Sequence, residues 1–391
     1  MPNRLVYLDN AATTAVRPEV LEAMLPFLGV EAFGNPSSPH RFGRAARAGI
    51  ETAKRTIAEA LGAEPNQIIF TSGGTEADNL AVIGGALASR DRGGPFRVAV
   101  SAIEHKAALA AAHFVTHLGG EEIVLPVSAG GVVEPDALAD ALARGVGVVS
   151  VMWVNNEVGT IQPIAQVAAT CREAGVCFHS DAVQALGKVP VSVRDSGVSL
   201  LSISGHKIGA PKGIGALVVR DRGAVEAIIH GGGQQFGLRP GTENVPGIIG
   251  LGKAVELAAG EQAALARRVA ALRDDLERRL LAIVPDAVIN AWQSERAPHI
   301  SNASIPGTDS EAMLMHLDLA GVACSAGSAC STGSVEPSHV LTAIGVPPEL
   351  GVSALRFSFG RDTSAADVDG VIGVLPRIVE KVRALGAVLH R

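Results

Sequence analysis

The chain has 391 residues, of which 47% are hydrophobic, and its formal net charge is −6. This length leaves room for two domains with a large buried core, and the composition excludes an intrinsically disordered chain. The negative charge, with no basic stripe, argues against nucleic acid as a partner.

The amino-terminal segment, residues 1–14, shows no apolar h-region of signal-peptide length. No run of about 18 apolar residues, the length that crosses a membrane, occurs further along the chain. We therefore expect a cytoplasmic protein that makes no contact with a membrane.

Short apolar runs alternate with helical patterns between about residues 66 and 219. Continuous apolar strands separated by segments of helix length predict an α/β fold, with a mostly parallel sheet that is covered by helices on both faces. The expected strands are 68–72, 97–101, 122–127, 147–154, 176–181, 200–204 and 214–219.

The last third of the chain carries a different pattern. A long helical stretch runs over 245–284, and Gly260 is expected to divide it into two helices. Strands at 301–305, 322–325 and 354–359, followed by an amphipathic helix over 365–385, then predict a second, smaller α/β domain. We assign residues 16–262 to the large domain, and 1–15 together with 263–391 to the small one.

Polar sequences follow five of the strands expected in the large domain. In open parallel sheets, ligands bind beyond the carboxyl ends of the strands, so these sequences predict one site at one edge. They are residues 71–75, 104–105, 155–157, 180–184 and 204–207.

The first of these sequences is a candidate phosphate site. A strand ends, Gly73 and Gly74 turn the chain, and a helix begins near Thr75. The backbone N–H groups of a first helical turn and a threonine hydroxyl bind phosphate well. The sequence is neither a Walker loop nor a dinucleotide turn. The competing interpretation is a glycine turn with Thr75 as a helix N-cap.

Lys207 and Asp181 lie at the ends of two strands expected in the parallel sheet. A desolvated lysine can be a neutral amine that forms a Schiff base, although most lysines on loops are solvated. Asp181 ends an apolar strand, where a pyridinium nitrogen would justify a buried carboxylate, and a helix N-cap is the alternative. Phosphate cup, carboxylate and lysine together indicate pyridoxal phosphate. His105 could stack on its ring, unless it is an ordinary loop residue.

Four cysteines are too few for a disulfide framework and lack the CxxC spacing of a zinc site, so no metal is expected. Cys330 lies in a run of Gly, Ala, Ser and Thr over 324–334, which suits a mobile loop with a nucleophile. An incidental thiol on a surface loop is the competing interpretation. Arg356 could bind a substrate carboxylate through two hydrogen bonds, or could be a surface ion pair.

These motifs, in this order, resemble the cysteine desulfurases of the class V aminotransferase-like family, and the cysteine loop resembles their NifS/IscS-type branch. The likeness covers essentially the whole chain. It implies a fold-type I pyridoxal-phosphate enzyme whose small domain carries the cysteine loop. The matching segments are 7–14, 34–40, 71–79, 104–106, 202–215, 231–234, 238–246, 324–330 and 355–356.

The resemblance implies a role for each site residue. Lys207 would hold the cofactor as a Schiff base and move the substrate proton, Asp181 would pair with the ring nitrogen, and His105 would stack on the ring as part of the catalytic group. Cys330 would accept the sulfur. The remaining implied contacts are Gln184 and Asn156 near the ring hydroxyl, Gly74, Thr75, Ser204, His206 and the second subunit's Thr242 at the phosphate, and Asn156 with Arg356 at the substrate carboxylate.

The implied activity takes sulfur from L-cysteine, releasing L-alanine and leaving a persulfide on Cys330. A homodimer would then pass the sulfur to an acceptor protein, as in iron–sulfur cluster assembly or tRNA thiolation. IscS-type members commonly carry a further tail that docks the iron–sulfur scaffold, whereas this chain ends at Arg391, soon after its last helix. This departure bears on that partner and not on the chemistry.

Three alternatives remain beside the desulfurase. A selenocysteine lyase would differ in its preferred substrate. Another class V enzyme, such as an aminotransferase or a kynureninase-like hydrolase, would not need Cys330. An inactive homologue could act as a sulfur-relay scaffold, but the presence of Lys207, Asp181 and Cys330 argues against it.

Overall fold

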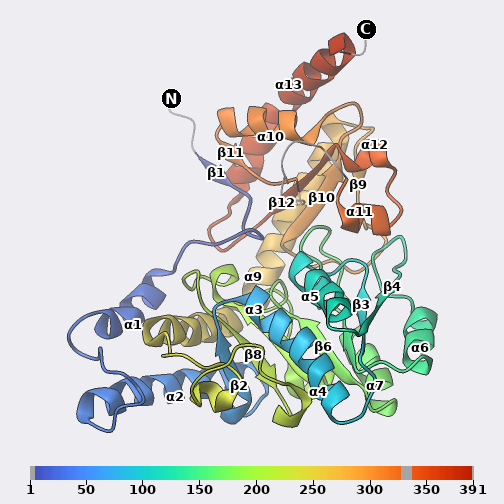
Figure 1. Cartoon of the computed structure of the whole chain (residues 1–391). Helices are drawn as coiled ribbons and strands as arrows, with labels where there is room; N and C mark the ends of the chain where they lie inside the picture. The colour runs from blue at the N-terminus through green and yellow to red at the C-terminus, as the bar shows by residue number, and fades with distance from the viewer. Residues whose placement is uncertain (1–4, 327–336, 390–391) are drawn as a thin grey trace.

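A seven-stranded sheet in the order β2-β8-β7-β6-β5-β3-β4 forms the centre of the larger part of the molecule (Figure 1). The computed structural model describes residues 5–326 and 337–389. Neighbouring strands are parallel, except that β8 is antiparallel to both β2 and β7. This confirms the predicted α/β fold with a mostly parallel sheet. The strands are β2 (Ile68–Thr71), β3 (Arg97–Ser101), β4 (Glu121–Leu125), β5 (Val148–Ser150), β6 (Cys177–Asp181), β7 (Leu200–Ser204) and β8 (Gly215–Val219).

Apolar residues pack on both faces of this sheet, as its continuous apolar strands require. Ile68 and Phe70 of β2 belong to a cluster with helices α2 and α9, while Ile69 between them packs with helix α3 on the other face. The helices of this part are α1 (Pro18–Leu28), α2 (Arg41–Leu61), α3 (Gly74–Asn79), α4 (Gly85–Asp91), α5 (Lys106–His117), α6 (Pro135–Ala143), α7 (Ile164–Glu173) and α8 (Val193–Ser196), with a π-helical segment Leu80–Gly84 between α3 and α4.

Strand β5 is shorter than the predicted strand 147–154, because its ladder to β3 ends at Ser150. Beyond that point the carboxylate of Glu104, at the end of β3, takes the place of a backbone partner. Its Oε1 atom accepts the N–H of Met152 at 2.5 Å. The apolar pattern alone could not show that a side chain interrupts the ladder.

Helix α9 (Val245–Ile283) runs without a break from the large sheet into the smaller part of the molecule (Figure 1). The predicted break at Gly260 is therefore wrong. A Cβ atom at Gly260 would meet nothing within 4 Å, so this residue lies on an open face of the helix. Buried residues on both sides, such as Val255 and Val269, hold the helix together, and they outweigh the roughly 1 kcal/mol cost of one glycine.

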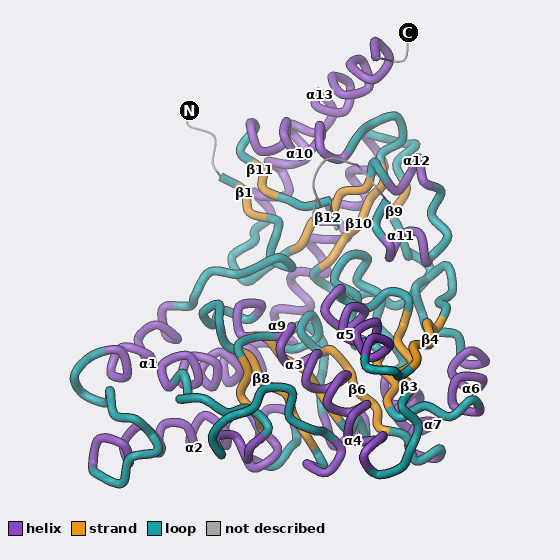
Figure 2. Tube along the Cα trace, in the orientation of Figure 1, coloured by secondary structure: helices purple, strands orange, loops and turns teal. Residues whose placement is uncertain are grey.

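The smaller part has its own sheets and core, and its strands form a second group in Figure 2. Its core contains Leu8, Leu276, Met313, Phe357 and Leu375, all at most 1% exposed. The predicted domain boundaries stay a prediction. The elements are an antiparallel sheet β12 (Ala354–Ser358), β10 (Ile300–Ser304) and β9 (Val288–Ile289), a parallel pair β1 (Val6–Tyr7) and β11 (Val322–Ala323), and helices α10 (Ser310–Leu319), α11 (His339–Ala343), α12 (Pro348–Gly351) and α13 (Ala365–Leu389).

Within residues 5–326 and 337–389, no helix combines the length and the apolar character that spanning a membrane requires. The same residues contain no group of three or more His, Cys, Asp or Glu side chains placed to hold a metal ion.

Candidate active site

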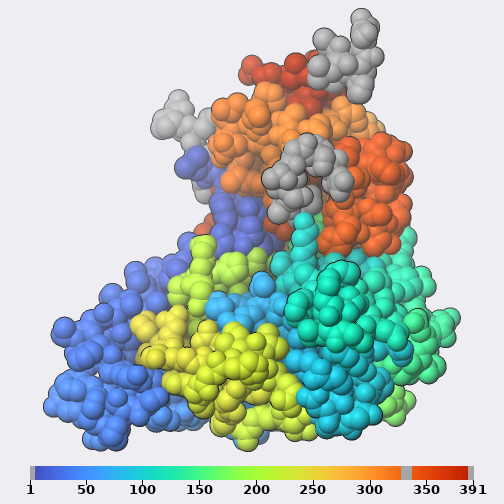
Figure 3. Space-filling view, in the orientation of Figure 1, coloured from blue at the N-terminus to red at the C-terminus, as the bar shows by residue number. Residues whose placement is uncertain are grey.

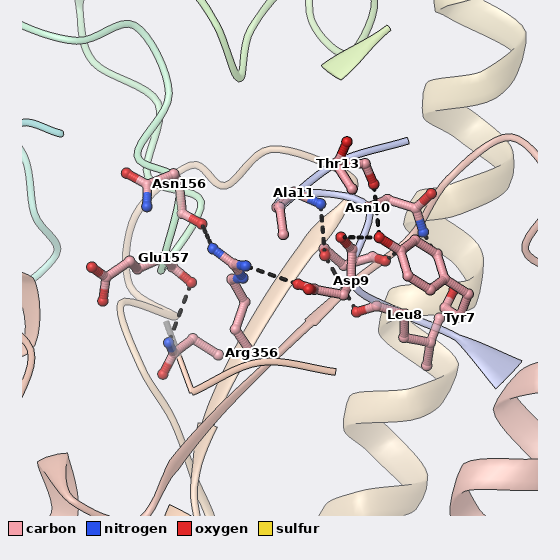
Figure 4. Close-up of polar contacts among 12 residues, drawn as sticks. Tyr7, Leu8, Asp9, Asn10, Ala11, Thr13, Asn156, Glu157 and Arg356 are labelled. Atoms are coloured by element: carbon pink, nitrogen blue, oxygen red, sulfur yellow. Dashed lines mark hydrogen bonds and ion pairs between the residues drawn. The ribbon is translucent and has the colours of Figure 1, made fainter. Parts of the chain in front are cut away.

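The turn after β1 brings the amino-terminal segment to the end of the large sheet. Three contacts hold this turn: the Tyr7 hydroxyl donates to the Thr13 carbonyl at 2.9 Å, the Asn10 side chain to the Ser358 carbonyl at 2.9 Å, and the Ala11 N–H to the Ser358 hydroxyl at 2.9 Å (Figure 4). The turn therefore presents its carbonyl groups and the Asp9 carboxylate in fixed positions.

Lys207 ends the short 3₁₀ helix Gly205–Lys207 that follows β7. Its Nζ atom donates to the carbonyl oxygens of Ala11 and Ala12, at 2.6 and 2.7 Å. The lysine also lines a cavity of about 540 Å³ beside the amino-terminal segment. Burial, with the nearby positive charge of Arg356, lowers the pKa of Lys207 to about 8. A neutral amine still has two N–H donors, so both hydrogen bonds can persist after deprotonation.

We expect trace acetylation of the cofactor-free chain by acetic anhydride to report this lowered pKa. Labelling of Lys207 should rise about tenfold between pH 7 and 9 with a midpoint near 8, because only the neutral amine reacts. Mass spectrometry of the Lys207 peptide measures the profile, with N-acetyl-lysine as the reference amine. Labelling that keeps rising tenfold per pH unit above pH 9 would show an ordinary lysine instead.

Asp181 and His105 lie at the ends of β6 and β3, as predicted. Asp181 is only 4% exposed, and its Oδ1 atom accepts the N–H of Val183 at 2.8 Å. His105 caps helix α5, and its Nδ1 atom accepts the N–H of Ala107 at 3.2 Å. Burial lowers the pKa of His105, so a neutral ring with its proton on Nε2 is favoured. A neutral imidazole suits stacking on another ring.

Gln184 is joined to Lys207 through a shared acceptor. Its Nε2 atom donates to the Ala11 carbonyl at 2.8 Å, the same oxygen that accepts from Lys207. Its Oε1 atom lies 3.2 Å from Nε2 of His299, a buried ring that the sequence analysis did not single out. The one available signal was a histidine directly before β10, and that signal is too weak by itself.

The expected phosphate end contains a buried hydroxyl with no partner. Oγ of Ser204, at the end of β7, makes no hydrogen bond within the described residues. A Cβ atom on Gly74 would lie 3.5 Å from the Ser204 Cβ and 2.9 Å from a methyl group of Val183, so only glycine fits here. Thr75, in the first turn of α3, is exposed. Ser204 thus lies beside the glycine start of α3, whose first turn contains Thr75.

The other two predicted phosphate ligands are His206 and Thr242, of which Thr242 is expected to come from the second subunit. The His206 ring faces the amino-terminal segment, with Nδ1 3.1 Å from the Thr13 hydroxyl, and burial together with the Lys207 charge lowers the pKa of His206 to about 4. Thr242 is exposed and lines a separate surface hollow with Phe33 and Asn35. The fold of one chain thus does not bring Thr242 into the group around Lys207.

Arg356, on β12, is 4% exposed and points between Asp9 and the Asn156 backbone (Figure 4). The NH2 group of Arg356 forms an ion pair with Asp9 Oδ1 at 2.9 Å, and its NH1 group donates to the Asn156 carbonyl at 2.9 Å. Its Nε atom is buried without a partner in the described part of the chain. Asn156 therefore meets Arg356 through its backbone. Asp9 is the residue that the sequence analysis missed, although it lies in a matching segment.

Cys330 lies outside the described residues, but contacts hold the described chain on both sides of it. Ser325 forms a β-bridge with Arg356, with the Ser325 N–H 3.1 Å from the Arg356 carbonyl. On the return side, the Ser338 hydroxyl donates to Glu157 at 2.5 Å. The segment that contains Cys330 thus leaves and rejoins the described structure next to Arg356 and the loop of Glu157.

The other three cysteines are poor nucleophiles. Burial raises the pKa of Cys171, Cys177 and Cys324 to about 12 in each case. Only the thiolate form of cysteine attacks efficiently, so none of these three is suited to catalysis at neutral pH.

Comparison with known proteins gives the same result in sequence and in structure. The family model described as Aminotransferase class-V matches residues 6–371. A cysteine desulfurase IscS of Dictyoglomus turgidum is 48% identical over 382 residues, which cover 98% of this chain and 96% of the relative. A cysteine desulfurase IscS of Methanosarcina thermophila is 46% identical, over 97% of this chain and 93% of the relative.

Solved structures extend the likeness to the whole fold. A protein described as NifS-like superposes with a TM-score of 0.89 at 33% identity, covering 97% of this chain and all of the other. A structure described as SspA in complex with cysteine gives a TM-score of 0.78 at 34% identity, covering 90% of this chain and 98% of the other. The resemblance drawn from the motifs is thereby confirmed.

Proposed function

This chain belongs to the class-V aminotransferase family and is a cysteine desulfurase, and from this premise we propose that it uses pyridoxal phosphate on Lys207 and transfers sulfur to Cys330. The observation that carries the proposal is the convergence at one sheet edge of a lysine with a lowered pKa, a buried carboxylate and an unpartnered hydroxyl. When bound, the cofactor supplies an electron sink for the substrate carbon atoms.

The residues present fit this cofactor. Asp181 is a buried carboxylate whose Oδ1 atom meets one backbone N–H, which suits a protonated ring nitrogen as its further partner. The Ser204 hydroxyl lacks a partner beside the glycine start of α3, which suits a phosphate group. Gln184 would serve the ring hydroxyl, and His105 would stack on the ring. Lys207 would move the proton at the substrate Cα.

We further propose that the enzyme acts as a homodimer, with Thr242 serving the phosphate site of the partner subunit. Apolar side chains are exposed on the projecting arm that α1 and the following loop form (Figure 3): Leu28 is 60% exposed, Val30 85% and Phe33 65%. Thr242 shares a surface hollow with Phe33. A second copy that covers this surface would bury the apolar side chains and could receive Thr242.

Arg356 and Cys330 would act on the substrate in turn. Arg356, with the side chain of Asn156, would bind the carboxylate of L-cysteine, and the Cys330 thiolate would attack its sulfur. An S–S bond forms, the substrate Cβ–S bond breaks with its electron pair passing to carbon, and a proton completes L-alanine. The sum is L-cysteine plus the Cys330 thiol giving L-alanine plus a Cys330 persulfide, which needs no external oxidant.

Chain geometry supports this role for Cys330. Cys330 comes five residues after Ser325, whose backbone is bonded to that of Arg356. Five extended residues span at most about 17 Å, so a thiol at this position can reach a substrate held by Arg356. A loop of small residues could then carry the persulfide to a sulfur-acceptor protein, such as an iron–sulfur scaffold or a tRNA-thiolation partner.

Alanine release from L-cysteine tests the proposal. We expect the cofactor-loaded wild type to release alanine in the presence of a thiol reductant, and Cys330→Ala to be slower by at least about 10²-fold, because the sulfur acceptor is lost. Without reductant, mass spectrometry should find one added sulfur atom on the Cys330 peptide.

Cys324→Ala is the matched control, since its partly buried thiol lies six residues earlier, has a pKa raised to about 12 and should be dispensable. Alanine release that survives in Cys330→Ala would show that sulfur leaves without this acceptor. A wild type that binds the cofactor but releases no alanine would contradict the proposed activity itself.

A further inference from the structure

The Gln184 side chain is bonded between two distant parts of the chain. Its Nε2 atom donates to the Ala11 carbonyl at 2.8 Å, and its Oε1 atom lies 3.2 Å from Nε2 of His299. Gln184 follows strand β6 of the large sheet, whereas His299 directly precedes β10 in the smaller part of the molecule. Both side chains are almost completely buried, with 5% of Gln184 and 1% of His299 exposed. The amide therefore has a protein partner at each of its ends.

The direction of both hydrogen bonds follows from the Ala11 carbonyl. A carbonyl oxygen only accepts, so the amide atom 2.8 Å from it must be the NH2 group of Gln184. The other end of the amide is then its oxygen, which also only accepts. His299 must therefore donate from Nε2, and a neutral ring carries its one proton there and not on Nδ1.

The surroundings of His299 fit this single tautomer. Nδ1 of the ring is buried and has no partner among the described residues, so a second ring proton would be a buried donor with nothing to bind. Burial, followed by the positive charges of Lys188 and Arg356, lowers the pKa of His299 well below its usual value. The ring is thus a neutral donor with one fixed direction.

One pair of strands holds both groups that bond Gln184. Ile300, the residue after His299, is the register partner of Ser358 on β12. The Ser358 hydroxyl accepts the Ala11 N–H at 2.9 Å. The Gln184 amide therefore lies between two groups whose positions are fixed together.

We propose that His299 is a positioning residue, which holds the Gln184 amide with its NH2 group toward Ala11 and Lys207. One N–H of that group bonds the Ala11 carbonyl, which also accepts from Lys207 Nζ at 2.6 Å. The second N–H is not bonded within the described residues and would serve the ring oxygen of the cofactor. In naming the cofactor, this inference rests on the proposed function.

Loss of the His299 donor would release the Gln184 amide. The Gln184 oxygen would then be a buried acceptor with no partner, and this cost favours rotation of the side chain out of its present position. His299 itself contacts the cofactor in no step of this role, because it acts through Gln184.

Neutron crystallography of the cofactor-free wild type tests the hydrogen-bond directions. Neutrons locate the hydrogen atoms that X-rays leave to inference at ordinary resolution. Near pH 7, a hydrogen or deuterium atom should lie on Nε2 of His299 and none on Nδ1, and the Gln184 nitrogen should face Ala11. A proton on Nδ1, or an amide with its oxygen toward Ala11, would overturn the proposal.

A double-mutant cycle on cofactor binding tests whether His299 acts through Gln184. Equilibrium dialysis of pyridoxal phosphate against the cofactor-free protein measures the dissociation constant. We expect His299→Leu and Gln184→Leu each to weaken binding by roughly tenfold, about the worth of one hydrogen bond. The double variant should stay within about threefold of Gln184→Leu, because His299 has no further effect once its partner is gone.

His299→Gln is the conservative variant, since its side chain also ends in an N–H donor. It should bind pyridoxal phosphate within about threefold of the wild type. Losses that multiply to about a hundredfold in the double variant would reduce His299 to a structural role and overturn the proposal. If His299→Leu does not fold, the neutron arm still decides, because it uses the wild type alone.

The two arms also separate this inference from the proposed function. The neutron arm needs neither cofactor nor turnover. The expected proton positions without any alanine release would keep His299 as the donor to Gln184 and remove the desulfurase. Alanine release with a proton on Nδ1 of His299 would do the reverse.

Discussion

Lys207→Ala is expected to reduce alanine release by roughly 10²–10⁴-fold, the range that loss of a positioned proton-transfer group usually costs. Lys207 would have two roles, binding the cofactor covalently and moving the Cα proton. Both depend on an amine whose pKa burial lowers to about 8. Alanine production and the visible absorption of the lysine-bound cofactor measure the two roles in one sample.

Lys212→Ala is the matched control, because this exposed lysine lines the same cavity five residues further on. It should retain activity and absorption within about twofold. Borohydride reduction before digestion should leave the cofactor on the Lys207 peptide of the wild type. If Lys207→Ala turned over at the wild-type rate, both roles would have to pass to another group, and the proposed site would be wrong.

The sequence predicted the large sheet well, because the hydrophobic pattern and the burial of the strands determine where they lie in the chain. Except for the edge strand β4, the strands of the large sheet are largely buried, so each appears as a mainly apolar run of the right length. The errors lie where tertiary contacts override local signals. Gly260 does not break α9, since packing on either side of it holds the helix. β5 stops at Ser150 because the Glu104 side chain, and not a backbone carbonyl of β3, accepts the Met152 N–H.

The part of the site that lies at the ends of strands was predictable from the sequence. Lys207, Asp181 and His105 follow strands directly, and parallel strands bring their carboxyl ends to one edge. The missed partners come from far away in the chain. The carbonyl of Ala11 accepts from a lysine 196 residues later, and a backbone carbonyl carries no sequence signal. Asp9 meets Arg356 across 347 residues.

Three buried polar side chains on the sheet face of Asp181 did leave a trace in the sequence. Ser150, His179 and Ser202 are buried in strands of the sheet, which is costly unless the polar groups bond one another. Their strands are neighbours in the sheet, but nothing local gives the strand order. That these three residues share one face of the sheet could therefore be seen only from the register of the paired strands.

Arg356→Ala is expected to lower kcat/KM for L-cysteine by roughly 30- to 1,000-fold, mostly through a higher KM, since truncating a buried charge partner costs about 2–4 kcal/mol. The Arg356 side chain is only 5% exposed, and its unpartnered Nε leaves a donor for a carboxylate. Initial rates over a range of L-cysteine concentrations measure the effect. Cysteamine, which lacks the carboxylate, should lose far less with this variant than L-cysteine does.

Asp9→Asn separates substrate binding from structural support. It keeps the guanidinium in place but removes the ion pair, whose carboxylate side chain is 22% exposed. We expect both variants to lower the free energy of unfolding, Arg356→Ala by about 1.5–3 kcal/mol and Asp9→Asn by less, because Arg356→Ala also loses the hydrogen bond to the Asn156 carbonyl, whereas the amide oxygen of the introduced asparagine can still accept from the guanidinium. Only Arg356→Ala should abolish the preference for L-cysteine over cysteamine. If both variants lost stability and neither changed that preference, Arg356 would be an anchor for the amino-terminal turn, and the substrate carboxylate would have to bind elsewhere.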